Sequence, residues 1–186
     1  MYKNSISCFL LIQVVCLSVL RAEIRMPAVF TDHMVLQRNS EVTLWGWGTP
    51  GEHISIMPKW LNGEEIKARA TNMGRWSARV RTVEAGGPYK IQINGSSQVT
   101  LSDVMLGEVW LCSGQSNMEW SVNHGINNGA EEAQQADFPN LRIFQPPQVG
   151  ASTPQENWFP QWTRCTPETI PRSKPRGYCF GPIHRE

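Results

Sequence analysis

The chain has 186 residues, of which 40% are hydrophobic and 18% charged, and its formal net charge is +1. This length suits one medium-sized domain or two small ones. A charge so close to zero does not favour nucleic acid or an anionic membrane surface as a partner.

Residues 1–22 predict an export signal. Lys3 supplies a positive charge, an apolar run covers residues 8–20, and Ala22 offers a small residue for cleavage. The run is short for a bilayer span, so we prefer a cleaved signal to an uncut signal anchor. The mature chain would then start at residue 23 and be secreted or lysosomal. No later segment is apolar enough for a membrane helix, so no membrane contact is expected after cleavage.

Cysteine usage and a sequon bear on the exported chain. Cleavage removes Cys8 and Cys16 and leaves three cysteines, which allow at most one internal disulfide: Cys112, Cys165 and Cys179. Their spacing does not indicate a metal site. Asn94 opens an Asn-Gly-Ser sequon and is predicted to be glycosylated if the chain is exported.

Residues 23–103 predict a small β-sandwich. Apolar and polar residues alternate in several short segments: 54–56, 66–70, 76–81, 89–93 and 99–101. Such alternation is typical of half-buried antiparallel strands, and turn formers such as Gly and Asn separate the segments. We expect Trp45, Trp47 and Trp76 to pack in the core, with sugar stacking as the alternative.

The pattern changes after Asp103. Residues 104–112 predict a strand, residues 128–136 a polar helix and residues 141–144 another strand. Strand, helix and strand in this order are typical of a parallel sheet. Residues from 146 onward are rich in Pro, Gln, Thr and Ser and predict a loop. Residues 171–186 have no pattern that assigns an element.

Ser116 is the candidate catalytic residue. Residues 107–118 (GEVWLCSGQSNM) are a mostly apolar run that ends in a small polar turn with Ser116 at its tip. Hydrolases of several classes mount a nucleophile after a strand in this way. A serine needs a base and oxyanion donors, and nearby backbone N–H groups could supply part of an oxyanion hole. On these residues alone, a turn or capping serine is favoured over a nucleophile.

No partner for Ser116 is evident in the chain. The candidate bases are the four histidines, which are His33, His53, His124 and His184. The first two lie in the β-rich part, the third follows Ser116 too closely, and the last lies two residues from the C-terminus. Asp103 and Asp137 are interpreted as turn or helix-end residues.

Several ordered motifs carry a family resemblance. Residues 107–118 closely resemble the nucleophile motif of the sialate O-acetylesterases, which belong to the wider SGNH-type esterase group. Residues 32–38 (DHMVLQR) resemble that family's motif near the mature N-terminus. Three further segments match in order: 45–51, 74–76 and 86–89. The resemblance covers about residues 24–168.

The resemblance implies both a fold and an activity. It implies a β-sandwich over residues 23–103, followed by the first part of a three-layer α/β/α SGNH-like domain over residues 104–186. It implies that Ser116 is the nucleophile in a two-step hydrolysis of O-acetylated sialic acid. It implies no metal and no organic cofactor. Substrate-binding residues are not assigned.

The chain also departs from the family. The family's catalytic histidine, its acidic partner and further oxyanion donors match no position of this sequence. Residues 172–182 (RSKPRGYCFGP) hold two prolines where the family has a helix. We therefore expect a chain truncated in its catalytic domain, with little activity and a poorly folded C-terminal half. The alternatives are a non-catalytic secreted β-sandwich that binds carbohydrate, and an acetylesterase for another acetylated sugar such as xylan.

Overall fold

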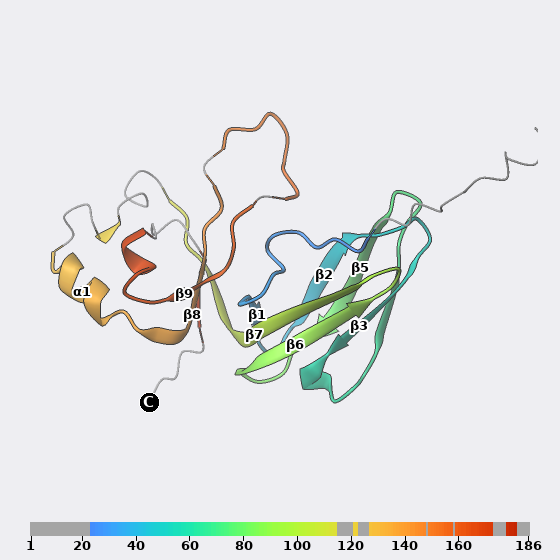
Figure 1. The fold of residues 1–186 in the computed structure, drawn as a ribbon, viewed down its shortest axis with the longest axis horizontal. Helices are drawn as coiled ribbons and strands as arrows, with labels where there is room; N and C mark the ends of the chain where they lie inside the picture. Colours follow the sequence, from blue (N-terminus) through green and yellow to red (C-terminus); the bar gives the residue numbers. More distant parts are fainter. Residues whose placement is uncertain are drawn as a thin grey trace, which may run out of the picture.

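The computed structural model describes residues 23–114, 121–122, 127–147, 149–157, 159–172 and 178–181 (Figure 1). Its strands are β1 (Val35–Gln37), β2 (Glu41–Trp47), β3 (His53–Pro58), β4 (Ile66–Arg69), β5 (Arg75–Arg81), β6 (Gly86–Asn94), β7 (Gln98–Leu111), β8 (Phe138–Phe144), β9 (Thr163–Cys165) and β10 (Tyr178–Gly181). Its helices are η1 (Lys59–Leu61), α1 (Gly129–Gln135) and η4 (Ile170–Arg172). Among these residues, no helix is both long and apolar enough to cross a membrane.

The strands before Leu111 form two sheets around one core, which we call the β-unit. One sheet has the order β4-β3-β6-β7, and the other pairs β2 with β5. Alternation explains the core: every second residue of β5 is buried, as are Ile54 and Ile56 of β3. These side chains join one hydrophobic cluster with Leu44, Ile91 and Val104. The half-buried antiparallel strands predicted for residues 23–103 are confirmed, and their assignment to a β-sandwich domain remains a prediction.

The predicted parallel sheet is wrong, because the sheet after β7 is mixed. The strand, helix and strand expected there are present as β7, α1 and β8. However, β10 lies between β7 and β8 and is antiparallel to both. It belongs to the segment in which the sequence showed no periodic pattern. Alternation of polar and apolar residues cannot be recognised over only four residues. Strand β10 is instead defined by its backbone pairing with β7 and β8. The three-layer α/β/α domain remains a prediction.

Strand β7 links the two parts of the structure. Its first half pairs with β6, and its second half pairs with β1 and then with β10. It runs without interruption past residue 103, where Asp103 has a φ of +54°. The domain boundary predicted at this point therefore falls inside a continuous strand, and the division into two domains remains a prediction.

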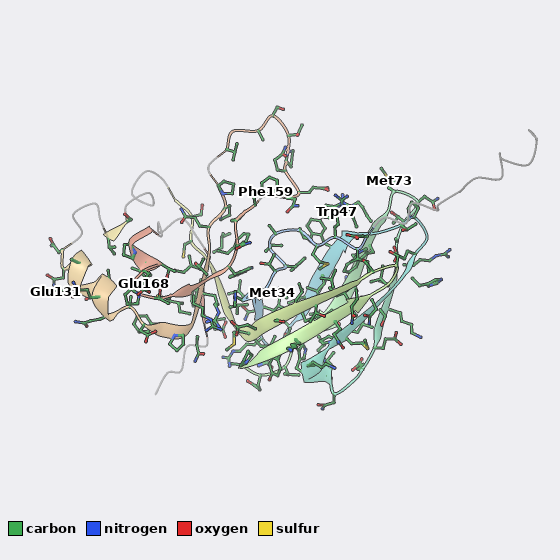
Figure 2. All side chains as sticks on the ribbon, in the orientation of Figure 1. Met34, Trp47, Met73, Glu131, Phe159 and Glu168 are labelled. Carbon is green, nitrogen blue, oxygen red and sulfur yellow. The ribbon has the colours of Figure 1, made fainter. Side chains whose placement is uncertain are left out.

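The part after β7 has a smaller core of its own. Ala136, Ile143 and Cys165 form a separate buried cluster. Phe144 and Trp162 instead join the core of the β-unit, with their ring centroids 5.1 Å apart. Phe159, on the loop between β8 and β9, is 99% exposed (Figure 2). Large apolar side chains are also exposed at Trp110, Leu111 and Phe138.

Candidate functional site

The predicted nucleophile lies just past the end of β7. Ser116 falls in residues 115–120, which are outside the described residues, as are His124 and His184. The structure follows the chain toward Ser116 as far as Gly114. Strand β7 leads toward Ser116, and residues 32–38 hold this strand in place.

Residues 32–38, the N-terminal motif, bind along β7 through their backbone. Strand β1 pairs with β7 in parallel, with Leu36 opposite Leu106. On the N-terminal side of this pairing, the Asp32 carboxylate accepts a hydrogen bond from the Ser102 backbone N–H at 2.6 Å. The backbone N–H of Arg38 donates to the carbonyl of Gly107. The motif thus contacts β7 from residue 102 onward.

Side chains of the same motif fix the next residues of β7. Gln37 accepts a hydrogen bond from the Val109 backbone N–H at 2.9 Å and donates one to Glu108 at 3.0 Å. Arg38 Nε donates to the other carboxylate oxygen of Glu108 at 2.7 Å. The hydrogen bonds from Gln37 and Arg38, together with the Arg38 charge, hold the pKa of Glu108 below its ordinary value. The motif therefore positions the strand that carries the predicted nucleophile turn.

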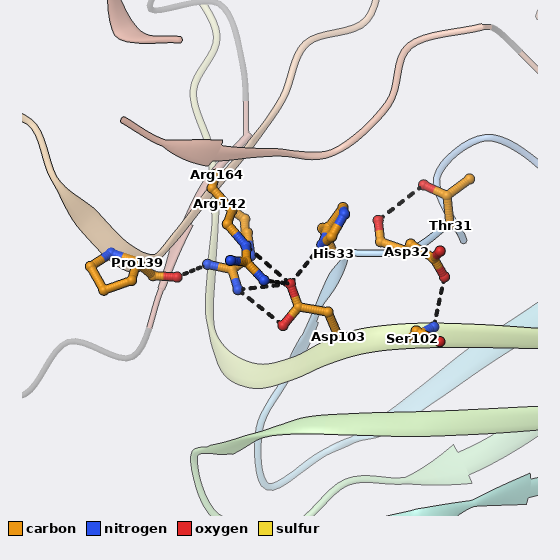
Figure 3. Close-up of polar contacts among 8 residues, drawn as sticks. All are labelled: Thr31, Asp32, His33, Ser102, Asp103, Pro139, Arg142 and Arg164. Atoms are coloured by element: carbon orange, nitrogen blue, oxygen red, sulfur yellow. Dashed lines mark hydrogen bonds and ion pairs between the residues drawn. The ribbon is translucent and has the colours of Figure 1, made fainter. Parts of the chain in front are cut away.

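Asp103 is the centre of a charged cluster that joins four segments (Figure 3). His33 Nδ1, from the turn before β1, lies 2.6 Å from Asp103 Oδ2 and donates to it. Arg142 Nη2, from β8, lies 3.2 Å from the same oxygen. Arg164 Nη2, from β9, lies 2.7 Å from it. These residues, the Asp103 cluster, connect the β-unit to the part after β7.

Burial and charge oppose each other in the Asp103 cluster. Burial raises the pKa of Asp103, but the hydrogen bonds from His33 and Arg164 and the charges of the two arginines outweigh it and leave the pKa below its ordinary value. Arg142 is 2% exposed, and this burial lowers its pKa although Asp103 raises it. Arg142 Nη1 donates to the carbonyl of Pro139, whereas its Nε is buried without a partner among the described residues.

The pairing of His33 with Asp103 has the form of a catalytic base and its orienting carboxylate. Along β7, about 26 Å separate residue 103 from residue 111, where the strand that leads toward Ser116 ends. The Asp103 carboxylate is also shared with two arginines. We therefore assign His33 and Asp103 to the joint between β7, β8 and β9.

Sequence patterns alone do not reveal this cluster. The interpretation of Asp103 as a turn residue agrees with its φ of +54°. Arg142 and Arg164 are missing from the candidate residues of the sequence analysis. The available signal for Arg142 is a cation between the apolar residues Leu141 and Ile143 of a predicted strand. Such a cation requires a partner, since an unpaired buried charge is costly.

The remaining predicted site residues have separate environments. Asn94 is half-buried on the hairpin between β6 and β7. Cys112 and Cys165 are free thiols, and burial raises the pKa of the Cys165 thiol. Within the described ranges, no group of three or more His, Cys, Asp or Glu side chains could hold a metal ion.

A cavity of about 370 Å³ lies where the loop after β8 meets the β-unit. Arg75 of β5 and Glu156 of the loop both line it and form an ion pair, with an Nη1 to Oε1 distance of 2.5 Å. Asn157 accepts a hydrogen bond from the Ala28 backbone N–H at 2.8 Å. The lining residues are Pro27, Ala28, Val29, Trp45, Arg75, Phe144, Pro146, Gln155, Glu156 and Asn157.

Comparison with known proteins gives this geometry a context. The chain is 34% identical to the mouse sialate O-acetylesterase over 64% of this chain and 24% of that protein. It is 28% identical to the human sialate O-acetylesterase over 78% of this chain and 30% of that protein. The chain is a homologue of the sialate O-acetylesterases. It therefore spans about a quarter to a third of the length of these relatives.

The fold comparison agrees with this relationship. A carbohydrate acetylesterase from Xanthomonas citri superposes with a TM-score of 0.76 at 29% sequence identity, covering 82% of this chain and 35% of that one. No protein-family model matches the chain. The resemblance to sialate O-acetylesterases that the sequence motifs indicated is confirmed.

Proposed function

We propose that this chain is part of a serine esterase that hydrolyses acetyl esters of carbohydrates, with Ser116 as its nucleophile. The carrying observation is that the N-terminal motif is bound along β7, the strand that leads into the Gly-Gln-Ser-Asn turn. The named activities of the homologues supply the reaction class. A rigid strand suits a nucleophile, since small displacements of a reacting atom are costly in rate.

In the proposed reaction, the Ser116 hydroxyl oxygen attacks the acetyl carbonyl carbon while a general base takes its proton. The tetrahedral intermediate then expels the sugar oxygen, which receives that proton and leaves as a hydroxyl. Water attacks the acetyl-serine in the second step and releases acetate. Backbone N–H groups of the turn would stabilise the oxyanion. The base is not assigned, since His33 belongs to the Asp103 cluster and His53 lies on the far strand β3.

The finer parts of the proposal concern substrate and location. We propose an O-acetylated sialic acid as substrate, without metal or organic cofactor. Residues 1–22 would be removed on export, Asn94 would be glycosylated, and the mature protein would be secreted or lysosomal. Residues 23–103 would form a β-sandwich domain, with an SGNH-like esterase domain beginning at residue 104.

A chimera tests the nucleophile. The segment of the mouse relative that aligns with this chain is replaced by the corresponding residues of this chain, and hydrolysis of an O-acetylated sialic acid is measured. We expect Ser116→Ala to lower kcat/KM by at least about 1,000-fold, as loss of a serine nucleophile does. Ser113→Ala, three positions before Ser116 in the same segment, is the matched control and should change kcat/KM less than about fivefold. Hydrolysis that persists in Ser116→Ala would refute the assignment of Ser116 as the nucleophile.

A second measurement addresses the 186-residue chain by itself. We propose that it hydrolyses acetyl esters far more slowly than the chimera, because the sequence positions of its four histidines do not favour any of them as the base for Ser116. Equal rates for the chain and the chimera would contradict this. Binding of glycans by the chain, with no turnover in the chimera either, would favour the non-catalytic carbohydrate-binding alternative. Preferred hydrolysis of acetylated xylan would favour the alternative substrate.

A further inference from the structure

We propose that the cavity lined by Arg75, Glu156 and Trp45, which we call the Arg75 cavity, binds an uncharged sugar residue of the substrate. This would be a residue next to the acetylated one in an oligosaccharide. The inference deepens the proposed carbohydrate esterase function and rests on it. It does not depend on the chemistry of Ser116.

The place of the cavity in the sheet is the first argument. Both β7 and β8 are antiparallel to β10, so they run parallel to each other. Their carboxyl ends therefore lie at the same edge of the sheet (Figure 1). Strand β7 leads from this edge to Ser116, and Phe144, the last residue of β8, lines the cavity. The cavity therefore lies at the edge of the sheet from which β7 continues toward Ser116.

The polar groups of the cavity suit sugar hydroxyls. The side chains of Arg75 and Glu156 are 47% and 51% exposed, so solvent and ligands reach both. Arg75 offers N–H donors and Glu156 offers carboxylate acceptors. The amide nitrogen of Gln155 donates to Thr153, which leaves its oxygen as an acceptor, and the amide oxygen of Asn157 accepts from Ala28, which leaves its N–H groups as donors. A hydroxyl group donates and accepts at once, so donors and acceptors that line the same cavity match it.

Trp45 supplies the apolar surface beside these groups. Its indole lines the cavity, and the Arg75 guanidinium lies 5.6 Å from the ring centroid. Neighbouring rings fix its orientation, with Phe30 at 6.2 Å and Trp47 at 5.2 Å between centroids. A fixed aromatic ring and a few placed polar groups are typical of small-molecule sites, and a volume of about 370 Å³ accommodates a single sugar ring.

The charge balance selects an uncharged sugar. Arg75 and Glu156 are the charged residues of the lining, and their charges cancel. A sugar carboxylate would have to compete with Glu156 for the guanidinium, or lie beside a like charge. An uncharged ring can instead bind both partners without breaking their ion pair.

Nuclear magnetic resonance of the 186-residue chain tests this inference, with the Trp45 indole N–H signal as the site-specific readout. The probes are methyl β-galactopyranoside and, for comparison, the methyl glycoside of N-acetylneuraminic acid. We expect saturable shifts of the Trp45 signal with the neutral sugar and at least fivefold weaker binding of the acidic one. Arg75→Gln and Glu156→Gln should each weaken binding of the neutral sugar about tenfold, the effect of losing a hydrogen bond to a charged group.

Arg79→Gln is the matched control. Arg79 lies on the same exposed face of β5 and pairs with Glu41 at 3.6 Å, but it does not line the cavity. Its affinity for the neutral sugar should stay within twofold of the wild type. Equal losses in Arg75→Gln and Arg79→Gln, tighter binding of the acidic sugar, or an unchanged Trp45 signal would each overturn the inference.

The outcome separates this inference from the proposed function. Binding is measured in the wild-type chain and again in Ser116→Ala, so that its outcome does not depend on turnover. If the chain does not bind the sugar but the chimera shows Ser116-dependent hydrolysis, only the proposal of sugar binding in the Arg75 cavity is refuted. If binding is normal but hydrolysis does not depend on Ser116, only the assignment of Ser116 as the nucleophile is refuted.

Discussion

The β-unit and the part after β7 are stabilised in different ways. In the β-unit, two sheets bury a large shared core that includes Leu44, Ile56 and Ile93. The later part has the small cluster around Ile143, exposed apolar side chains and a charged joint to the β-unit. Strand β7, which leads to Ser116, is therefore held mainly by the β-unit at its N-terminal half. The β-unit is stabilised by hydrophobic packing, whereas the part after β7 is attached to it by specific polar contacts.

The largest expected effect separates the two cores directly. Ile93→Ala in β6 removes a side chain that is fully buried in the large core, and we expect it to lower the free energy of unfolding by about 4 kcal/mol. Ile143→Ala in the small cluster should cost about 2 kcal/mol, because fewer neighbours surround the new cavity. Urea unfolding of both variants measures the difference. Equal costs would contradict the contrast between the two cores.

The second-largest expected effect on stability concerns the Asp103 cluster. Asp103→Asn keeps a residue type that tolerates a positive φ but leaves the buried Arg142 without its counter-charge. We expect a loss of about 3 kcal/mol in the free energy of unfolding, as for other broken buried ion pairs. Glu84→Gln, which removes an exposed partner of Arg38, is the control and should leave stability unchanged. A similar change in both variants would show that the joint contributes nothing special.

The same joint predicts a pH dependence. The pKa of Asp103 is lower in the folded chain than in the unfolded chain, where it is about 3.9. Its contribution is therefore present above about pH 4 and is lost as the pH falls toward the folded pKa. We expect the free energy of unfolding to fall less steeply with acidification in Asp103→Asn than in the wild type. Parallel pH profiles would rule out this linkage.

These contrasts also mark what the sequence could predict. Alternation in segments such as residues 76–81 predicted the strands of the β-unit, because the pattern of apolar and polar residues within each strand shows which face is buried. Strand β10 and the mixed sheet could not be predicted, because a short strand is defined by its partners and not by its own pattern. The Asp103 cluster could not be predicted for a related reason. Asp103 and Arg142 lie 39 positions apart, and no local rule joins them.

The smallest effect concerns the exposed end of β7. Trp110 is 57% exposed, so Trp110→Ser removes little buried surface and should change the free energy of unfolding by less than about 0.5 kcal/mol. Exposed apolar strand ends favour association, so the variant should aggregate at a higher concentration than the wild type. Light scattering over a concentration series measures this. A large loss of stability instead would show that Trp110 packs in the folded chain.

Hydrogen exchange along β7 tests most directly the claim that this strand is held from its N-terminal side. The account predicts that amides of residues 104–107 exchange as slowly as those of β3 and β6, through global unfolding. It predicts that amides of residues 110 and 111 exchange faster, together with those of β8 and β9. Uniform protection along β7, or faster exchange at residues 104–107 than at residues 110 and 111, would contradict it.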